Sequence, residues 1–257
     1  MTGTIVEKLL ESLAGPAPVF CAWVGMNEPA AAEALAREAF DAVILDMQHG
    51  ALDFAGACGG IAASALAGRP AIVRVPVGEF ATASRALDAG AAGVIAPMIN
   101  SRADAERFAA FTKFPPLGER SWGPRGALPL SGLDTQDYLA SANRLVRAIA
   151  MIETREALAA LDAILATPGI DGVFVGPNDL SIGLSRGDAI APDGAEVERA
   201  LGEVAARAAA HGKFAGLFCP DGRRAKWAGE RGFALRTVST DLALLRAAAR
   251  AELAAAR

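Results

Sequence analysis

The sequence predicts one (β/α)8 barrel domain that spans residues 1–257, and three observations support this fold class. Short apolar runs alternate with longer, alanine-rich helical patterns along the whole chain. The runs are apolar throughout, which is typical of parallel strands that are covered on both faces. A length of 257 residues suits one large α/β domain. A doubly wound open sheet is the alternative, but no Gly-x-Gly-x-x-Gly turn follows the first run.

The elements follow one another in the order that such a barrel requires. The segment MTGTIVEKLLESLAG predicts an amphipathic helix, with Thr4 and Glu7 at capping-box spacing, and not a signal peptide. Helical patterns over 28–40, 79–90, 101–111 and 154–166 lie between the apolar runs, and several end at Gly or before Pro. The predicted strands are PVFCAWVG (18–25), DAVILD (41–46), AIVRV (71–75), AGVIAPM (92–98), LVRAIAMIE (145–153), GVFVGP (172–177), FAGLF (214–218) and FALRTVS (233–239).

Two connections, 113–140 and 179–196, are longer than the others and rich in Gly and Pro. We expect them to be functional loops, because long connections in compact barrels often are. The last helical pattern, 241–257, places Leu242, Leu245, Ala249 and Leu253 on one stripe. This stripe packs within the chain or on a neighbouring subunit.

Composition excludes several classes of function. The net charge is −4 and the Lys and Arg residues are scattered, so nucleic acid is not the expected partner. No apolar run reaches the roughly 18 residues of a membrane span. The three cysteines, Cys21, Cys58 and Cys219, are far apart and odd in number, which predicts reduced and mostly buried thiols. A cytoplasmic protein is the expectation that follows.

Polar residues stand at the ends of several predicted strands, where barrel enzymes place their chemistry. Asp46 ends the second strand, and His49 follows three residues later. Arg74 lies near the end of the third strand, Glu153 ends the fifth, and Asp179 follows the sixth. A lone charge at a strand end is usually a rim residue, but an acid, a base, a cation and a second acid from four strands favour an active site.

Glu153 and Asp179 are the most informative pair of carboxylates, because they stand at the ends of neighbouring predicted strands, which lie about 4.8 Å apart. Two carboxylates with positions left for water and substrate suit Mg²⁺, Mn²⁺ or a similar hard divalent ion. The alternative is that Glu153 forms an ion pair with Arg74 or Arg155 and binds no metal.

Other residues narrow the chemistry. None of the four lysines ends a predicted strand, so a Schiff-base mechanism is not expected, and no Gly-x-Ser-x-Gly elbow is present. His211 stands before Gly212 at a helix end, where interaction with the helix terminus explains it. Trp23, near the end of the first strand, is either a core residue or a wall of the substrate pocket.

Seven motifs point to one known family: AWVG, the Asp-x-x-His of LDMQHG, RVP, LDAGAAGVIAPM, FPPLGERSWG, IETREAL and DGVFVGPNDLS. Of these, IETREAL and GVFVGPNDLS together are specific, because a chance match in the right order is improbable. With these motifs the chain resembles the HpcH/HpaI aldolase family of metal-dependent pyruvate aldolases, from about residue 18 to 240. The resemblance implies a (β/α)8 barrel, and a homohexamer of dimers that exchange their last helix.

The resemblance also implies a reaction: reversible cleavage of 2-oxo-4-hydroxy acids to pyruvate and an aldehyde through a pyruvate enolate, with a divalent cation (Mg²⁺, Mn²⁺ or Co²⁺). Oxaloacetate decarboxylation is the implied side activity. Glu153 and Asp179 correspond to the metal ligands and His49 to the base. Asp46 corresponds to an acid that orients the base, and Arg74 to the contact of the pyruvate oxygen.

Further positions match substrate contacts of the family. Backbone amides around Asn178 and Asp179, in the Gly176-Pro177 segment, are similar to those that hold the pyruvate carboxylate. Trp23 is similar to a residue that lines the aldehyde side, and Asp88 to an aspartate that reaches a neighbouring subunit's site.

Two departures concern the substrate. Met151 stands where many members have Gln, and Met47-Gln48-His49 stands where many read Gly-Glu-His. Two other functions stay open at this point. One is an acyl-CoA lyase on the same barrel, for which Arg120, Arg125 and Arg186 are the candidate contacts of the CoA phosphates. The other is a barrel without catalytic activity that serves as a binding module.

Overall fold

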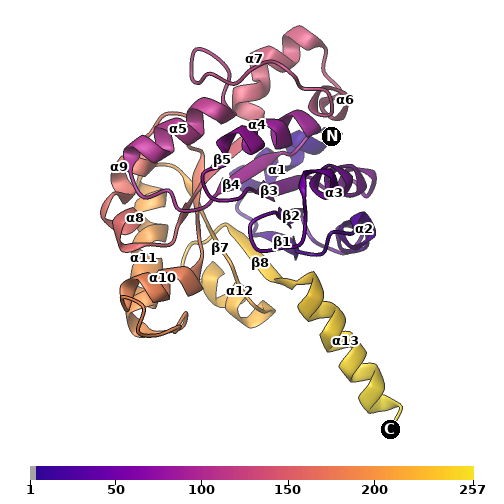
Figure 1. The fold of residues 1–257 in the computed structure, drawn as a ribbon, viewed down its shortest axis with the longest axis vertical. Helices are drawn as coiled ribbons and strands as arrows, with labels where there is room; N and C mark the ends of the chain where they lie inside the picture. Colours follow the sequence, from indigo (N-terminus) through magenta and orange to yellow (C-terminus); the bar gives the residue numbers. More distant parts are fainter. Residues whose placement is uncertain (1–3) are drawn as a thin grey trace.

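The computed structural model describes residues 4–257 and shows the predicted barrel (Figure 1). Eight parallel strands close in sequence order, and β1 pairs with both β2 and β8. Every predicted strand is confirmed, with ends that differ by a few residues. The strands are β1 (Val19–Val24), β2 (Ala42–Asp46), β3 (Ala71–Arg74), β4 (Gly93–Ala96), β5 (Arg147–Ile152), β6 (Gly172–Val175), β7 (Phe214–Leu217) and β8 (Leu235–Thr240).

Helices surround the strands, and the first of them has the predicted capping box. Glu7 N–H donates to Thr4 Oγ1 at 3.4 Å, and Thr4 N–H donates to Glu7 Oε2 at 3.0 Å. The helices are α1 (Ile5–Ala14), α2 (Pro29–Ala36), α3 (Phe54–Leu66), α4 (Phe80–Ala89), α5 (Arg102–Thr112), α6 (Ala127–Ser131), α7 (Thr135–Leu145), α8 (Arg155–Ala159), α9 (Leu161–Leu165), α10 (Pro177–Leu184), α11 (Ala195–Ala210), α12 (Gly222–Gly229) and α13 (Asp241–Ala255).

Three expectations about the connections need correction. The helix predicted over 154–166 is divided into α8 and α9 at Ala160, whose ψ of 3° departs from the helical value. The connection 113–140 contains α6 and the start of α7, so it is only partly a loop. Residues 179–184 belong to α10, because Pro177 at its first position is already set to a helical φ.

The two-residue period of the strands decides which side chains enter the barrel. In β2, Ala42 and Ile44 face the interior cluster, whereas Val43 and Leu45 face the cluster under the helices. The same alternation points Asp46 inward, and in β3 and β5 it points Arg74 and Glu153 inward at the carboxyl ends. The polar strand ends therefore converge over an apolar interior.

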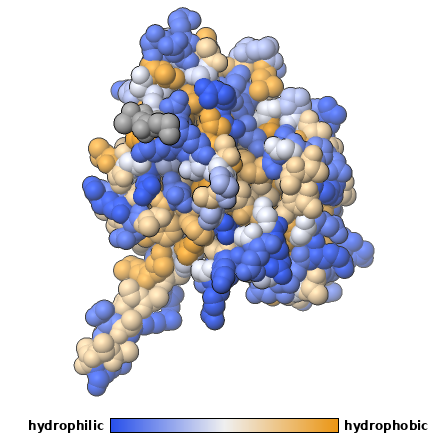
Figure 2. Space-filling view, turned by 180° about the vertical axis from the view of Figure 1, so that it is seen from behind, coloured by the Kyte–Doolittle hydropathy of each residue, from blue (hydrophilic) through white to orange (hydrophobic). Residues whose placement is uncertain are grey.

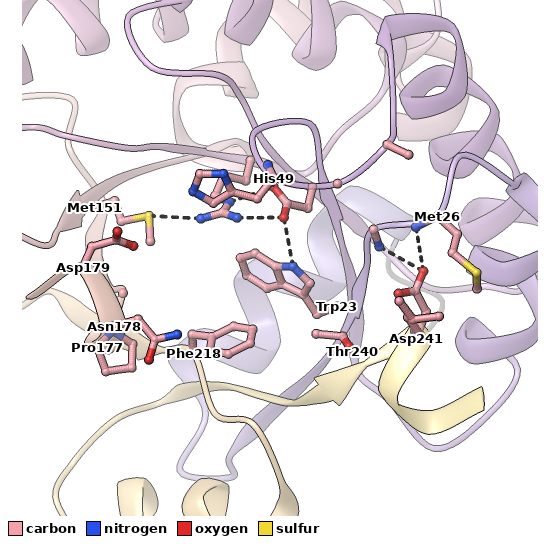
Figure 3. A pocket seen from close by; sticks show the side chains of 17 residues that line it. Trp23, Met26, His49, Met151, Pro177, Asn178, Asp179, Phe218, Thr240 and Asp241 are labelled. Atoms are coloured by element: carbon pink, nitrogen blue, oxygen red, sulfur yellow. Dashed lines mark hydrogen bonds and ion pairs between the residues drawn. The ribbon is translucent and has the colours of Figure 1, made fainter. Parts of the chain in front are cut away.

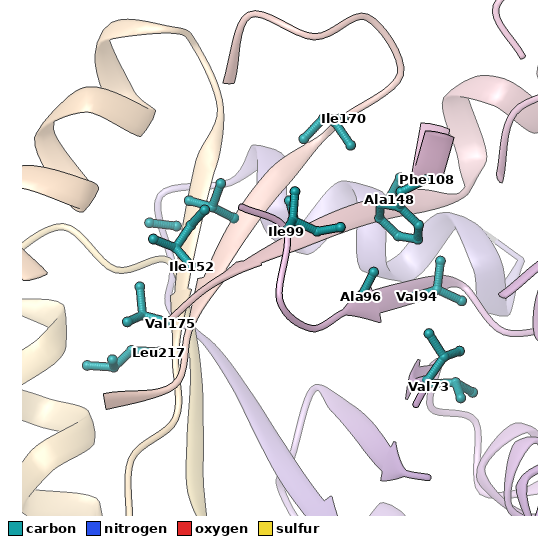
Figure 4. Packing of buried hydrophobic residues seen from close by; sticks show 14 of the residues in the cluster. Val73, Val94, Ala96, Ile99, Phe108, Ala148, Ile152, Ile170, Val175 and Leu217 are labelled. Carbon is teal, nitrogen blue, oxygen red and sulfur yellow. The ribbon is translucent and has the colours of Figure 1, made fainter. Parts of the chain in front are cut away.

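The main hydrophobic layer lies between strands and helices, as Figure 4 shows for Val73, Val94, Ile152, Val175 and Leu217. All five side chains are fully buried. At about 25 cal/mol for each Å² of apolar surface removed from water, this layer is the main stabilising term of the fold. It leaves the carboxyl ends of the strands free to carry polar residues.

The last helix, α13, does not cover the barrel but projects away from it (Figure 1). Leu242, Leu245 and Leu253 are each more than half exposed along it, and Figure 2 shows hydrophobic residues along this protruding arm. Among residues 4–257, no helix is both long enough and apolar enough to cross a bilayer.

Candidate active site

A pocket of about 520 Å³ opens at the carboxyl ends of the strands (Figure 3). It brings together almost all of the residues that the sequence analysis assigned to one site. Those that line it are Trp23, Asp46, His49, Arg74, Met151, Gly176, Pro177, Asn178 and Asp179. Glu153 lies directly behind this lining, since it approaches the same point above Gly176 as Asp179 does.

Asp46 and Arg74 form a buried, bidentate ion pair at the floor of the pocket. They are opposite each other in the β2–β3 register. Arg74 Nε donates to Asp46 Oδ1 at 2.8 Å, and Nη2 donates to Oδ2 at 2.7 Å. Burial raises the pKa of Asp46, but the hydrogen bonds and the charge of Arg74 outweigh burial, so the pKa lies below its ordinary value. The pair fixes the guanidinium plane and leaves Nη1 facing Met151.

Trp23 lines the pocket and is at the same time a buried side chain, and its contact with substrate stays a prediction. Its indole N–H donates to Asp46 Oδ2 at 3.2 Å, and its ring lies 4.7 Å from the Arg74 guanidinium. Phe218 meets the Trp23 ring edge-on at 5.1 Å. These contacts hold the ion pair against an aromatic surface.

Glu153 is 2% exposed, and only one of its carboxylate oxygens has a partner. Oε1 accepts the Met98 backbone N–H at 2.7 Å. Within residues 4–257, no donor reaches Oε2. Burial and the nearby Asp179 carboxylate raise the pKa of Glu153 to about 7, against the hydrogen bond from Met98. Arg74 donates to Asp46 and Arg155 to Leu184 O, so neither forms the alternative ion pair with Glu153, and the metal-ligand role of Glu153 stays a prediction.

The Glu153 and Asp179 carboxylates face one point. A side-chain Cβ built on Gly176 would lie 3.0 Å from Glu153 Oε2 and 3.6 Å from Asp179 Oδ2. The β5–β6 pairing confirms that the two residues follow adjacent strands. A buried carboxylate oxygen without a donor fits a hard divalent cation. In the described chain no third His, Cys, Asp or Glu joins them, so water and substrate would complete the coordination.

The amino end of α10 faces the same pocket. Pro177 is its first residue, Gly176 precedes it, and no side chain caps the first turn. The orphan N–H groups of a helix start bind carboxylates and phosphates well. An acidic group next to the two carboxylates would therefore find donors in the backbone of Asn178 and Asp179.

His49 is an exposed residue that lines the pocket (Figure 3). We expected Asp46 to orient its imidazole, but the structure gives Asp46 other partners: Arg74, Trp23 and the backbone N–H groups of Gln48 and His49, at 3.0 and 3.3 Å. The carboxylate therefore fixes the loop that carries His49. The role of His49 as base stays a prediction.

Met151 takes the position where a polar amide was expected in similar chains. Its Sδ lies 4.0 Å from Arg74 Nη1. Its methyl group would lie 2.6 Å from a Cβ on Gly176, the same point that Glu153 Oε2 approaches. An apolar methyl therefore stands beside the unpartnered carboxylate oxygen.

Asp88, which the sequence analysis matched to a neighbour's site, does not line the pocket of its own chain. It lies on α4 and pairs with the buried Arg120 at 2.7 Å.

His211 is the C-cap residue of α11, as predicted, and contacts Asp162 at 3.2 Å. The three cysteines are free thiols.

Several residues of this site were not predicted from the sequence. Among them are Phe218, Thr240 and Asp241, which line the pocket, and Met98, whose N–H donates to Glu153. Asp241 directly follows the last strand, as Asp46 ends the second, so the same strand-end pattern could have found it. Met98 acts through its backbone at a φ of 57°, for which the sequence carries no mark.

Comparisons with known proteins agree with this geometry. The family model described as HpcH/HpaI aldolase/citrate lyase matches residues 20–248. A hydroxypyruvate/pyruvate aldolase of Rhizorhabdus wittichii is 43% identical over 240 residues, 93% of this chain and 94% of the relative. A 5-keto-4-deoxy-D-glucarate aldolase of Escherichia coli is 31% identical over 243 residues, 94% of this chain and 93% of the relative.

A solved structure is similar over the whole chain. It is an HpcH/HpaI aldolase/citrate lyase family protein from Burkholderia cenocepacia, with a TM-score of 0.87 and 34% identity. The match covers 99% of this chain and 100% of the other. The resemblance seen in the sequence motifs is thereby confirmed.

Proposed function

Because the chain belongs to the HpcH/HpaI aldolase/citrate lyase family and is a carbon–carbon lyase, we propose that it cleaves 2-oxo-4-hydroxy acids reversibly to pyruvate and an aldehyde. The proposal includes dependence on a divalent cation (Mg²⁺, Mn²⁺ or Co²⁺), which Glu153 and Asp179 would hold. The observation that carries it is the buried, unpartnered Oε2 of Glu153, which faces the same point as Asp179. When bound there, such a cation supplies Lewis-acid stabilisation of charge on the 2-oxo oxygen.

The remaining residues have separate tasks. The amino end of α10, at Asn178 and Asp179, binds the substrate carboxylate. Arg74, fixed by Asp46, donates to the 2-oxo oxygen, where negative charge develops as the carbon–carbon bond breaks. His49 takes the proton of the C4 hydroxyl in cleavage, and in the reverse direction it takes a methyl proton of pyruvate.

The same enolate chemistry would decarboxylate oxaloacetate, so this substrate belongs to the proposal. The proposal includes hydroxypyruvate as a substrate beside pyruvate, because the Rhizorhabdus wittichii relative is named for both. Trp23 and Phe218 form an aromatic wall that excludes water from the reacting carbons.

The experiment is metal removal and replacement. Pyruvate release from a 2-oxo-4-hydroxy acid is measured after dialysis against a chelator and again after Mn²⁺ or Mg²⁺ is added. We expect activity to disappear and then to return. Borohydride with pyruvate should leave the enzyme active, since no lysine lines the described pocket. Undiminished turnover without metal, or inactivation by borohydride, would refute the proposal.

An acyl-CoA lyase is the second candidate on this barrel, and the pocket disfavours it. Arg74 is the one Lys or Arg among the residues that line the described pocket, and it is already paired with Asp46. Arg120 is buried against Asp88, and Arg125 and Arg186 do not line the pocket. Apart from Arg74, the lining of the described pocket therefore offers no cationic side chain to the CoA phosphates. Release of CoA from malyl-CoA or a similar thioester would reverse this ranking.

We also propose that subunits exchange α13 in a homo-oligomer, for which the family resemblance predicts a hexamer. The projecting α13 leaves a cavity of about 430 Å³ beside β1 and β8, where the last helix of a barrel would pack. Phe20, Phe40 and Val238 line it. It is apolar, as are the exposed leucines of α13. In such an assembly Asp88 would reach a neighbour's site.

Light scattering tests this exchange. Replacement of both Leu245 and Leu253 by Asp should convert the oligomer into monomers, because it places charges in an apolar interface. The matched control replaces Ala247 and Ala251, on the opposite side of α13, by Asp. Equal masses for the two double variants would refute the exchange.

A further inference from the structure

The end of β8 departs from regular pairing just before α13 begins. Cys21 of β1 pairs with Thr237, but Trp23 pairs with Thr240, so one extra residue of β8 is accommodated. Ser239 takes a φ of 66°, which is uncommon for any residue but Gly. An irregularity of this kind bends a strand and redirects the side chains that follow. Here it turns Asp241 back over the end of β1.

Asp241 is a 5% exposed carboxylate whose two oxygens accept only backbone N–H groups in the described chain. Oδ2 accepts from Gly25 at 2.9 Å and from Met26 at 2.8 Å. Oδ1 accepts from Leu242 at 2.7 Å. Charge-assisted hydrogen bonds of this kind are about twice as strong as neutral ones. The first residue of α13 therefore fixes the loop after β1, more than 200 positions away in the sequence.

That loop in turn fixes the loop that carries His49. Ala51 N–H donates to Gly25 O at 2.7 Å. A Cβ built on Gly50 would lie 2.9 Å from both the Cα and the O of Gly25, so the two loops touch through their backbones. A chain of backbone contacts thus leads from Asp241 through Gly25 to the residues that follow His49.

We propose that Asp241 is a positioning residue: it sets the place of His49 in the pocket through the loops at Gly25 and Gly50. This inference rests on the proposed function, in which His49 moves the proton. Figure 3 shows Asp241 and Met26 at the other end of the pocket from Asp179 and Met151. Loss of the Asp241 contacts should therefore change proton transfer and leave the binding of metal and carboxylate intact.

The variant Asp241→Asn tests the proposal. The backbone N–H groups now use both carboxylate oxygens of Asp241, whereas the amide of Asn has only one acceptor oxygen. We expect kcat to fall about 10- to 100-fold, since displacement of a catalytic group such as the His49 imidazole by about 1 Å can lower the rate by that factor. The Kd of oxalate in the presence of Mn²⁺, measured by calorimetry, should stay within about twofold. Asp134→Asn is the matched control, because Asp134 accepts two backbone N–H groups at 2.9 Å at the start of α7.

A second measurement does not depend on activity. The chain has two histidines, so its imidazole NMR spectrum contains one signal from His49 and one from His211. Asp241→Asn should shift the His49 signal and leave the His211 signal in place. If the wild-type enzyme has no aldolase activity but the His49 signal moves, the coupling holds and only the proposed function fails.

Gly50→Ala separates positioning from a simple loss of charge. Its methyl group would press on the Asp46 carbonyl oxygen as well as on Gly25, without changing any charge, so it should move the His49 signal and lower kcat in the same way. Gly202→Ala, which meets nothing within 4 Å, is the control. An unchanged His49 signal in both Asp241→Asn and Gly50→Ala would overturn the proposal, as would a loss of kcat that is matched by an equal loss of oxalate binding.

Discussion

The two ends of the barrel each carry buried charges, and Lys113 at the amino end differs from Glu153 at the carboxyl end in whether its polar atoms have partners. At the amino end, Lys113 Nζ donates to Asp171, Asn143 O and Val146 O at 2.7 to 2.9 Å. Asp171 also accepts from Arg147 at 3.1 Å and from the Ala148 N–H at 2.7 Å. Every donor of Lys113 is thus used.

The carboxyl end has the same types of residue with a different result. Asp46 and Arg74 satisfy each other, but Glu153 keeps one oxygen without a donor among residues 4–257. A buried charge without a partner lowers the free energy of unfolding, so a group of this kind is a candidate for binding a ligand. The Lys113–Asp171 pair stabilises the fold at the amino end, whereas the unpartnered Glu153 oxygen lies at the candidate site of the carboxyl end.

Removal of the Glu153 charge should have the largest effect on activity. In Glu153→Gln we expect kcat/KM for cleavage to fall by at least about 1000-fold, because a neutral amide holds a hard cation poorly. The free energy of unfolding without metal should not fall, since a buried, unpaired charge is lost. Steady-state kinetics and urea unfolding measure the two effects.

Glu156→Gln, an exposed change in the first turn of α8, is the control for this prediction. A strong loss of stability in Glu153→Gln would show that Glu153 is a structural residue like Asp171. The contrast between the two ends of the barrel would then disappear.

Removal of the charge at the amino end should do the reverse. Asp171→Asn leaves the Lys113 ammonium, whose side chain is 1% exposed, without its anion. We expect the free energy of unfolding to fall by about 3 kcal/mol, as it does when one partner of a buried pair is removed. The kcat of the folded protein should stay within about twofold. Urea unfolding at neutral pH checks this.

The exposed Asp162→Asn, which loses contacts to Arg207 and His211, is the comparison for Asp171→Asn. It should change stability much less, because solvent screens exposed ion pairs. If Asp171→Asn lowers kcat as strongly as Glu153→Gln does, the amino end has a direct part in the reaction.

The convergence of the polar side chains at the carboxyl end of the barrel was predictable from the sequence. Asp46, Arg74 and Glu153 occupy positions that the two-residue period of a parallel strand points into the barrel. Strand order then brings them together, because neighbouring strands in a closed barrel are neighbours in sequence. These are rules of local geometry and need no contact information.

The remaining parts depend on backbone turns, which the sequence does not reveal. Met98 and Ser239 adopt positive φ values although neither is Gly, so no residue type marks them. The need for Gly at position 50 becomes clear only from the structure, because the Gly25 backbone leaves no room for a side chain there. The Asp46–Arg74 pair also needed the structure, because sequence reasoning matched Asp46 with His49.

The charge of Glu153 should make the metal-free protein less stable as the pH rises. Its pKa is raised from 4.5 to about 7 in the folded state, so between these values the folded protein binds more protons than the unfolded one. The Glu153 contribution is fully present below pH 4.5 and is lost by about pH 7. At about 1.4 kcal/mol for each pKa unit, the loss over this pKa range is at most about 4 kcal/mol.

Urea unfolding in chelator, from pH 4.5 to 8, measures this slope. The difference between wild type and Glu153→Gln isolates it from the Asp46 carboxyl, whose lowered pKa acts in the opposite direction. Parallel curves for the two proteins would mean that the Glu153 carboxylate already has a partner without metal.

Met151→Gln should give the smallest effect and shows why the unpartnered oxygen is costly. The Met151 methyl group and Glu153 Oε2 approach the same point above Gly176, so the oxygen has an apolar neighbour. A Gln amide there can donate to Oε2 while its carbonyl accepts from Arg74 Nη1. One hydrogen bond to a charged group contributes about 1 to 2 kcal/mol, so the pH-dependent loss of stability should shrink by about that amount. Because Glu153 and Asp179 keep their places, kcat should change by less than about tenfold. A stability curve identical to that of the wild type would mean that the amide does not reach Oε2, and that the apolar contact alone does not explain the raised pKa of Glu153.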